Sequence, residues 1–255
     1  MPRIRDTKHS DSYILRVITY NIQYCGGREN GSIGYFIPSL PSRRKEIMEK
    51  ISKVLALHEP DVLGLIEVDS GSWRNAGVNQ AKYIAKKLDL PHLIEGCKYL
   101  TPFDIFPFFK YNTLAIASKN PMDTSQTHQL VAGFKRNIIE ANAAFITFIL
   151  CHLSLGKNAR VLQIHHMVQI INSINTPIVL MGDFNAEPDT VEIKNLVSKA
   201  GLNLVPLEAT YPSWRPKKKL DHFLVSSDIQ VKSASVLDIG LSDHLPIVLD
   251  IILDK

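Results

Sequence analysis

Two apolar segments that each end in polar residues constrain most strongly what this chain can fold into. DVLGLIEV spans residues 61–68, and IVLMGDFN spans residues 178–185. Neither segment alternates regularly between apolar and polar residues, as a strand with one solvent-exposed face would. We therefore expect both to be strands buried inside the protein. The second segment raises a further question: what do the polar side chains of Asp183 and Asn185, at the end of a buried strand, interact with?

Other segments supply the remaining elements. Apolar and β-branched residues predict strands within Tyr13–Asn21, Asn112–Ser118, Asn137–Leu153, Leu220–Ser226 and Leu245–Leu253. Apolar residues at helical spacing predict helices at Ser42–His58, Asn75–Leu88 and Asn158–Ile174, and Asp189 or Thr190 can cap a short helix that runs to Lys199. The strands come in groups with interspersed helices, unlike the strict alternation of a barrel or a doubly wound sheet. No repeat or linker is visible, so we expect one domain over residues 1–255 with a flexible N-terminus at residues 1–12.

The composition is typical of a globular protein with a sizeable core. Of the 255 residues, 45% are hydrophobic and 21% are charged, and the net charge of +4 slightly favours an anionic partner. Cys25, Cys97 and Cys151 lie at unrelated spacings, which predicts free thiols in a reducing compartment. No apolar signal region begins the chain, and no apolar run reaches about 20 residues. We therefore expect a cytoplasmic, monomeric protein without a transmembrane segment.

Polar residues lie where the predicted strands begin or end. They are Asn21, Glu67, His152, Asp183 with Asn185, Asp221, and Asp243 with His244. Residues at strand ends are well placed to converge on one edge of a sheet, where binding and catalytic side chains are commonly found. We therefore expect these residues to approach one another in the folded chain.

The pair Asp183 and Asn185 can act together. Residues two apart in an extended segment project to the same face, so Phe184 between them is expected to point into the core. A carboxylate only accepts hydrogen bonds, whereas a carboxamide both donates and accepts, so the pair could hold a water and a substrate oxygen. The alternative is an Asx-turn, in which the two side chains only bond to their own backbone.

Each of the other polar residues has a structural alternative as well. Glu67 lies inside an apolar strand, so it must be paired or bind a metal, and a salt bridge to an arginine would suffice. His152 ends a long apolar strand, where a histidine can simply be a satisfied structural residue. Asp221 and His222 are adjacent and face opposite sides, and we expect Asp221 to share the site. Asp243 and His244 fit a carboxylate–imidazole pair or a capped loop.

The set as a whole, in this order and in these strand contexts, resembles the endonuclease/exonuclease/phosphatase superfamily. The resemblance runs from Val17 to about Leu253 and rests on the first-strand Asn, the Glu of the second strand, the segment CHL, and the motifs GDFN, LDH and SDHLP. It implies a four-layer α/β sandwich with two mixed sheets packed face to face. It also implies hydrolysis of phosphoesters with a divalent cation, usually Mg²⁺, with Mn²⁺ as the alternative.

The resemblance also implies roles for single residues. Glu67 resembles the principal metal ligand, with Asn21 and Asp243 close to the metal. Asp183 resembles the carboxylate that activates the attacking water, and Asn185 the amide beside it. Asp221 and His244 resemble the Asp–His pair at the phosphate, and His152 the histidine of the deoxyribonuclease and sphingomyelinase branches. Gln23 and His152 stand where abasic-site endonucleases carry Asp and Tyr, which argues against that activity as the main one.

Two segments bear on the substrate. TYPSWRPKKKLDH (Thr210–His222) places Trp214, Arg215 and Lys217 just before Asp221, a combination that suits nucleic acid unless it is only a solvated loop. The Phe-rich segment Thr101–Tyr111 is either a substrate-facing or lipid-contacting wall or a buried strand pair. We therefore expect a nuclease that acts by in-line attack of water. The alternatives are a phosphodiesterase or phosphatase for a phospholipid or small phosphoester, and a binding module without catalysis.

Overall fold

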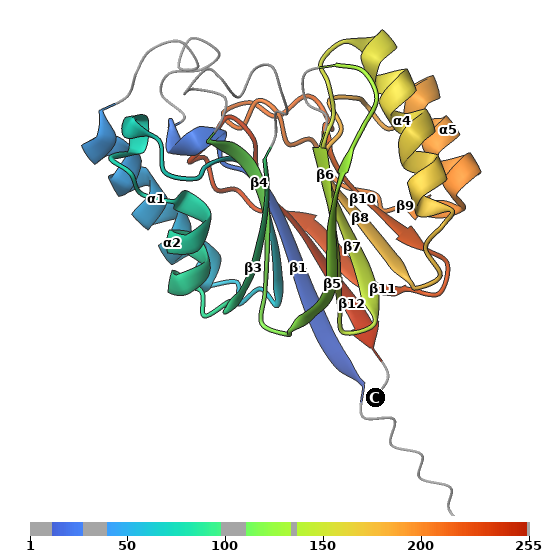
Figure 1. Ribbon diagram of the computed structural model, residues 1–255, viewed down its shortest axis with the longest axis horizontal. Coiled ribbons are helices and arrows are strands. Elements are labelled where there is room, and N and C mark those ends of the chain that lie inside the picture. Colours follow the sequence, from blue (N-terminus) through green and yellow to red (C-terminus); the bar gives the residue numbers. More distant parts are fainter. Residues whose placement is uncertain (1–11, 28–39, 98–110, 134–136, 254–255) are drawn as a thin grey trace, which may run out of the picture.

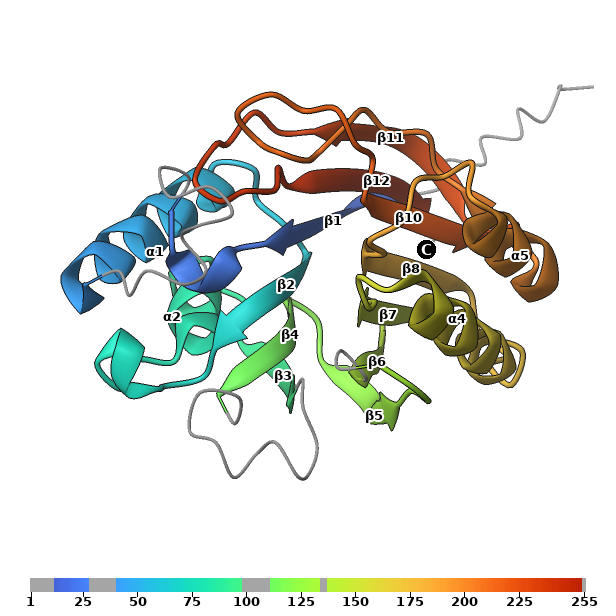
Figure 2. The same cartoon turned by 90° about the horizontal axis from the view of Figure 1, so that it is seen from above.

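The chain folds into two β-sheets packed face to face with helices on both outer surfaces. The computed structural model describes residues 12–27, 40–97, 111–133 and 137–253 of the 255 in the sequence. Within these residues, each sheet has six strands. Helices α1 (Pro41–Ala56) and α2 (Gln80–Lys87) cover one side, and α4 (Lys157–Ile171) and α5 (Val191–Ala200) the other (Figures 1 and 2). The predicted four-layer α/β sandwich is confirmed.

Parallel pairs lie in the middle of both sheets. The first sheet has the order β11 (Gln230–Val236), β12 (Ile247–Leu253), β1 (Tyr13–Asn21), β2 (Val62–Asp69), β4 (Asn112–Ser118) and β3 (His92–Cys97). The second has the order β5 (Met122–Gln129), β6 (Asn137–Ala143), β7 (Ile146–His152), β8 (Ile178–Asp183), β10 (Asp221–Ser226) and β9 (Leu202–Leu204). Strands β1 and β2 are parallel, as are β7 and β8, and the other pairs are antiparallel.

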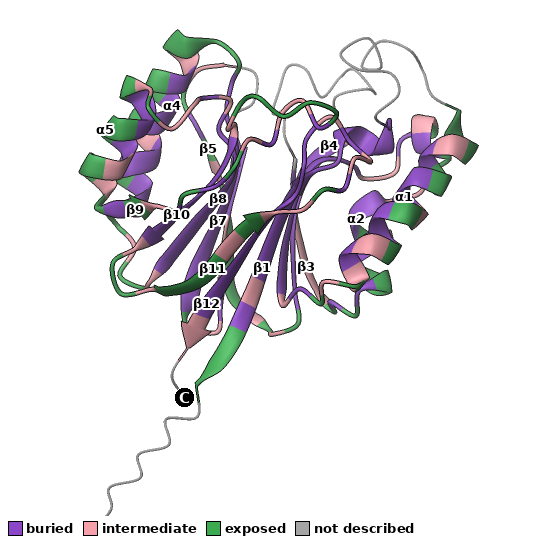
Figure 3. Ribbon diagram, turned by 180° about the vertical axis from the view of Figure 1, so that it is seen from behind, coloured by how far each residue is buried: buried purple, intermediate pink, exposed green. Residues whose placement is uncertain are grey.

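The central strands are buried on both faces, which explains their continuous apolar sequence. In β8, Val179 and Met181 join the core between the two sheets, while Ile178 and Leu180 pack under α4 and α5. Strand β2 divides its residues in the same way between the intersheet core and α1 and α2. Figure 3 shows the difference from edge strand β11, which carries exposed residues. The two predicted buried strands are therefore confirmed.

Two predicted elements are divided in the structure. The helix expected at Asn75–Leu88 begins only at Gln80, because Asn79 caps it by accepting a 2.9 Å hydrogen bond from the Lys82 backbone N–H. Residues Trp73–Asn75 form a separate 3-10 helix. The segment Asn137–Leu153 forms two strands, β6 and β7, since Ala144 and Phe145 turn the chain with positive φ.

Four strands carry no clear sequence signal, and all four are at sheet edges: β3, β5, β9 and β11. Exposed residues dominate β5 and β11, so an apolar pattern is absent there. The predicted flexible N-terminus lies outside the described residues apart from Ser12, and the Phe-rich segment lies outside them apart from Tyr111. No helix in the described part of the chain is long and apolar enough to cross a bilayer.

Candidate active site

Strand ends from both sheets meet at one edge of the sandwich, the upper edge in Figure 1. Asn21 ends β1 and Glu67 lies near the end of the parallel strand β2. His152 and Asp183 end the parallel strands β7 and β8 and are paired in register. Asp221 begins the antiparallel strand β10 directly opposite Asp183. The parallel and antiparallel registers together bring these five side chains to the same edge, as the sequence predicts.

Asp183 lies at the centre of this cluster and is buried. Its Oδ2 atom accepts a 3.2 Å hydrogen bond from Asn21 Nδ2 and lies 3.2 Å from His152 Nε2. Its Oδ1 atom accepts a 3.0 Å hydrogen bond from the backbone N–H of Asn185. The contact with Asn21 crosses from one sheet to the other. The Asp183 carboxylate is therefore fixed in orientation by groups from both halves of the sandwich.

His244 is held between two carboxylates. Its Nδ1 atom lies 2.8 Å from Asp221 Oδ2, and its Nε2 atom lies 3.8 Å from Asp183 Oδ2. Thr210 donates a 2.5 Å hydrogen bond from its hydroxyl to the same Asp221 oxygen. Burial alone would lower the pKa of His244, but the charges of Asp221 and Asp183 outweigh burial and raise this pKa to about 10. The imidazole is therefore a cation at neutral pH.

Replacing Asp221 by Asn is expected to lower the pKa of His244 from about 10, since Asp221 contributes most to raising it. An NMR titration of the His244 ring in the metal-free protein measures this change. The wild-type ion pair stabilises the fold below the unfolded pKa of about 6.5, and that contribution is lost as the pH rises towards 10. An unchanged His244 pKa in Asp221→Asn would show that the pair is not coupled.

Glu67 adopts a conformation that strands normally avoid. Its φ is 56°, and the pairing of β2 with β4 is irregular between Leu65 and Val68. A bulge of this kind redirects a side chain, and a non-glycine residue with positive φ persists only where the surrounding structure enforces it. The Oε1 atom of the redirected carboxylate lies 3.9 Å from His152 Nδ1. Glu67 thereby lines a cleft at this edge of the sandwich.

Asp243 adds another carboxylate to the cleft. Its Oδ2 atom accepts a 3.1 Å hydrogen bond from Gln23 Nε2. Burial raises the pKa of Asp243 to about 6; the nearby His244 opposes this rise, and the negative charge of Glu67 adds to it. Asp243 and Glu67 line the same cleft. A cation placed between them would relieve their repulsion.

Asn185 reaches the cleft by a different geometry from the extended one expected. Its φ is 50°, and its backbone N–H donates to Asp183 Oδ1 in an Asx-turn. The turn is present, but the two side chains do not bond only to their own backbone, because Asp183 also accepts from Asn21. Asn185 nevertheless lines the cleft, and its side-chain Nδ2 donates to the Leu153 carbonyl at 2.9 Å. Phe184 is fully buried as expected and packs edge-on against His222, which faces away from the site.

The loop Thr210–His222 brings only some of its aromatic and basic residues to the cleft. Tyr211 and Lys218 pair in a β-bridge and line the cleft, and the Tyr211 ring lies 4.9 Å from that of His244. Trp214, Arg215 and Lys217 lie between them, exposed at the tip of the loop and outside the cleft lining. The three can meet only a substrate that extends beyond the cleft.

The cleft has a volume of about 420 Å³. Its described lining consists of Asn21, Glu67, His152, Leu155, Arg160, Asp183, Asn185, Tyr211, Lys218, Leu220, Asp243 and His244. Sequence reasoning did not single out Leu155, Arg160 or Leu220. Arg160 is buried and donates to Glu192 at 2.9 Å and to the carbonyl of Leu155, so it fixes the loop after β7.

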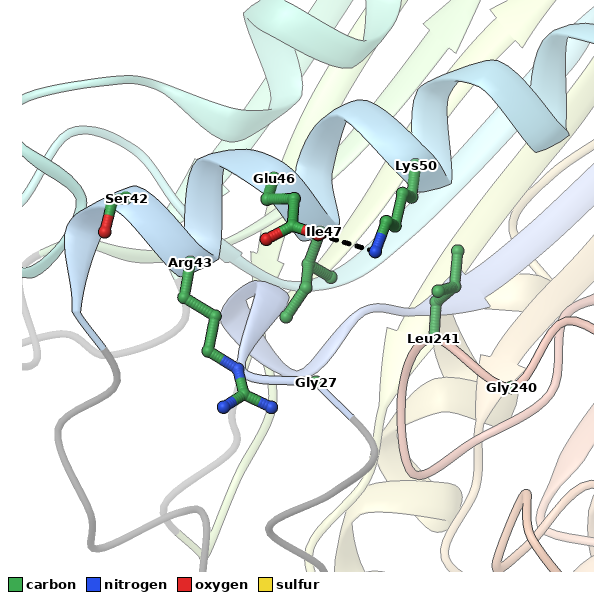
Figure 4. Close-up of a pocket in the computed structure, with 8 residues that line it drawn as sticks. All are labelled: Gly27, Ser42, Arg43, Glu46, Ile47, Lys50, Gly240 and Leu241. Carbon is green, nitrogen blue, oxygen red and sulfur yellow. Dashed lines mark ion pairs between the residues drawn. The ribbon is translucent and has the colours of Figure 1, made fainter.

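A larger cavity of about 810 Å³ lies beside α1 and is not lined by the polar cluster around Asp183. Figure 4 shows Arg43, Glu46 and Lys50 around it, with Glu46 and Lys50 paired at 2.6 Å. The opposite charges of the exposed Glu46 and Lys50 side chains largely cancel each other. The smaller cleft, with buried carboxylates and imidazoles, has the composition of a catalytic site.

The donor atoms of the cleft suit a divalent metal. Among the described residues, Asp183, Asp221 and His244 offer ligand atoms within 4.8 Å of one another, with Glu67 and Asp243 on the same cleft. These donors are mostly carboxylate oxygens, which hard cations prefer. None of the cysteines in the described part of the chain lines the cleft. The site therefore fits a cation of the Mg²⁺ or Mn²⁺ type.

Comparison with known proteins agrees with this geometry. A model of the Endonuclease/Exonuclease/phosphatase family matches residues 18–244. The chain belongs to this family. The family comprises phosphoester hydrolases, both nucleases and phosphatases. No curated protein sequence matches the chain.

Solved structures share the fold at low sequence identity. A family protein from Bacteroides thetaiotaomicron has a TM-score of 0.71 and 17% identity, covering 96% of this chain and 99% of its own. The mannosyl-6-phosphatase of the same organism has a TM-score of 0.70 and 19% identity, covering 94% and 100%. The human Nocturnin catalytic domain has a TM-score of 0.70 and 20% identity, covering 96% and 97%. The likeness extends over the whole sandwich and shows the fold alone.

Proposed function

We propose that this chain is a Mg²⁺-dependent phosphodiesterase that cleaves nucleic acid. The observation that carries the proposal is Asp183, held by Asn21 and His152 and facing the His244–Asp221 pair at the edge where both sheets meet. A phosphodiester is anionic and repels a nucleophile, so hydrolysis requires a placed base and cationic groups at the phosphoryl oxygens. This cluster supplies both.

The side chains divide into distinct roles in this proposal. Asp183 accepts the proton of the attacking water, because the raised pKa of His244 leaves that imidazole without a free base site. His244, kept cationic by Asp221, stabilises the negative charge that develops on the phosphoryl oxygens. His152 and Asn185 border the same space and orient water and phosphate.

The carboxylates of Glu67 and Asp243, together with Asn21, would hold the cation. Asp221 and Asp183 already contact the two ring nitrogens of His244. This arrangement favours Glu67, Asp243 and Asn21 for cation binding, and Asp183, Asp221 and His244 for proton transfer. When bound, a Mg²⁺ ion polarises a phosphoryl oxygen and offsets transition-state charge. The observed strain at Glu67 is consistent with a carboxylate held ready for that purpose.

The loop at residues 210–219 supports nucleic acid as the substrate class. Its tip exposes Trp214, Arg215 and Lys217 next to a cleft that Tyr211 and Lys218 line. Aromatic faces and cations together hold unstacked bases and the phosphate backbone. The loop is firmly placed, since Ser213 donates to the Asp243 carbonyl at 2.8 Å and to the Ser242 carbonyl at 2.5 Å.

A phospholipid or small phosphoester is the second candidate substrate. Leu155 lines the cleft while 75% exposed, and an apolar side chain at a catalytic cleft suits a lipid or another apolar group. A substrate panel separates the candidates: single- and double-stranded DNA, RNA, bis-p-nitrophenyl phosphate, phospholipids and inositol phosphates, each with Mg²⁺ and with EDTA. We expect cleavage of nucleic acid that EDTA abolishes and Mg²⁺ or Mn²⁺ restores. Turnover of a lipid alone would replace the first candidate by the second.

Reversing the charges of Arg215 and Lys217 to Glu is expected to reduce nucleic-acid cleavage at least about tenfold, because each cation that meets a phosphate contributes to binding. In a plot of log Kd against log salt concentration, the slope should decrease by about 1 for each phosphate interaction that the substitutions remove. The matched control reverses Lys82 and Lys86, two exposed lysines of α2, and should cleave normally. Equal cleavage by both double variants would remove the loop from the binding surface.

A further inference from the structure

The turn that follows β1 is left-handed over three consecutive residues. Gln23, Tyr24 and Cys25 have φ values of 45°, 53° and 54°, and all three are buried. Left-handed backbone is unfavourable for residues with a Cβ and is rarely found in a run. Such strain persists only where neighbouring groups hold it, and it is found preferentially at functional sites.

Side chains from three helices hold this turn. The Tyr24 carbonyl accepts a 2.6 Å hydrogen bond from Arg44 Nη1 of α1 and a 2.9 Å hydrogen bond from Gln80 Nε2 of α2. The Arg74 guanidinium lies over the Tyr24 ring, 5.4 Å from its centroid. Arg44 and Gln80 are buried. The turn is therefore clamped from α1, α2 and the Trp73–Asn75 helix, which stabilises an otherwise unfavourable backbone.

The turn places Gln23 between two residues of the cleft. The Gln23 backbone N–H donates to Asn21 Oδ1 at 3.2 Å, and Asn21 Nδ2 is then directed to Asp183. The Gln23 side chain donates from Nε2 to Asp243 Oδ2 at 3.1 Å. One residue thus bonds both the Asn21 amide and one oxygen of the Asp243 carboxylate, whose other oxygen accepts a 3.2 Å hydrogen bond from the Ser242 hydroxyl.

The amide of Gln23 suits this task because it is neutral. A lysine or arginine at this position would also donate to Asp243 but would cancel the charge that a cation needs. A neutral donor orients the carboxylate and leaves its negative charge in the cleft. Partners of this kind commonly affect metal affinity by about 10–100-fold.

We propose that Gln23 is a positioning residue that the clamped left-handed turn holds against Asp243, so that this carboxylate and the Asn21 amide face the cation. The inference rests on the proposed function in one respect, since it takes Asp243 as a metal-binding group.

The test is a double-mutant cycle between Gln23→Met and Asp243→Asn, read by calorimetric titration of the metal-free protein with Mg²⁺ or Mn²⁺ alone. Methionine keeps the length of the glutamine side chain and removes the donor. We expect Gln23→Met to weaken cation binding about 10–100-fold with an unchanged thermal unfolding midpoint, and to have no further effect in the Asp243→Asn background. Gln126→Met, on exposed edge strand β5, should bind as wild type does.

The other results separate this inference from the proposed function. Equal cation affinity of wild type and Gln23→Met would overturn the role of Gln23 and leave the metal site intact. An equal loss in both backgrounds would show a structural effect that does not pass through Asp243, which also overturns it. Failure of the wild type to bind either cation would overturn the proposed metal site and this inference with it. If Gln23→Met does not fold, Gln23→Leu, which is also neutral and also lacks the donor, takes its place in the cycle.

Discussion

Asp183→Asn is expected to keep the fold and to lose about 10²–10⁴-fold in catalytic rate, the range typical of a positioned general base. The substitution preserves the shape of the side chain but removes the negative charge that faces His152 and His244. The amide cannot accept the proton of the attacking water. Steady-state cleavage of the best substrate from the panel measures the loss, and circular dichroism checks the fold.

The matched control for this substitution is Asp189→Asn. Asp189 is exposed and lies in the turn that follows β8, six residues after Asp183. It makes the same chemical change outside the cleft, so the rate should stay within about twofold of wild type. An Asp183→Asn enzyme that is as active as this control would end the proposal that Asp183 takes the proton.

Gly182→Ala is expected to destabilise the protein by about 3–5 kcal/mol, the range of severe steric and backbone defects. The φ of Gly182 is +146°, which residues with a side chain rarely adopt, and an added Cβ would lie 2.0 Å from the Cys151 carbonyl oxygen of β7. Because that obstacle is backbone, β7 and β8 would have to separate next to His152 and Asp183. Equilibrium unfolding in urea measures the change.

Gly156→Ala is the control for the loss of a glycine. Its added Cβ would meet no atom within 4 Å, and its φ of −78° is ordinary for alanine. We expect a change below about 1 kcal/mol, the size of a helix N-cap substitution. If Gly182→Ala proves as stable as Gly156→Ala, then β7 and β8 leave space for the added Cβ that the structure does not show.

How much of the fold the sequence predicts depends on where a strand lies in its sheet. Central strands such as β2 and β8 are buried on both faces, so their apolar runs are continuous and identify them. Edge strands β5 and β11 expose most of their residues, and polar side chains there protect against unwanted pairing. Their sequences therefore carry the pattern of a loop. The pairing partners that make them strands are not marked by any local pattern.

The same distinction applies to the site. Side chains at strand ends, such as Asn21 and His152, were predictable because register brings those ends to one edge. Leu155 and Arg160 reach the cleft through the loop after β7 and the first turn of α4, and no periodic pattern marks such positions. The left-handed backbone at Glu67 was also invisible, because tertiary contacts impose it against local preference.

The hydrogen bond between Asn21 and Asp183 joins residues of different sheets. Neither half of the sandwich therefore carries the whole polar cluster, and the cluster forms only when the two halves dock correctly. Gly64 faces Leu150 and Met181 across that interface, where an added Cβ would lie within 3.0 Å of both side chains. A small shift in docking would displace the two halves of the cleft while each sheet kept its own backbone pairing. Activity is thus a sensitive reporter of tertiary assembly, one that should fail before spectroscopic measures of secondary structure change.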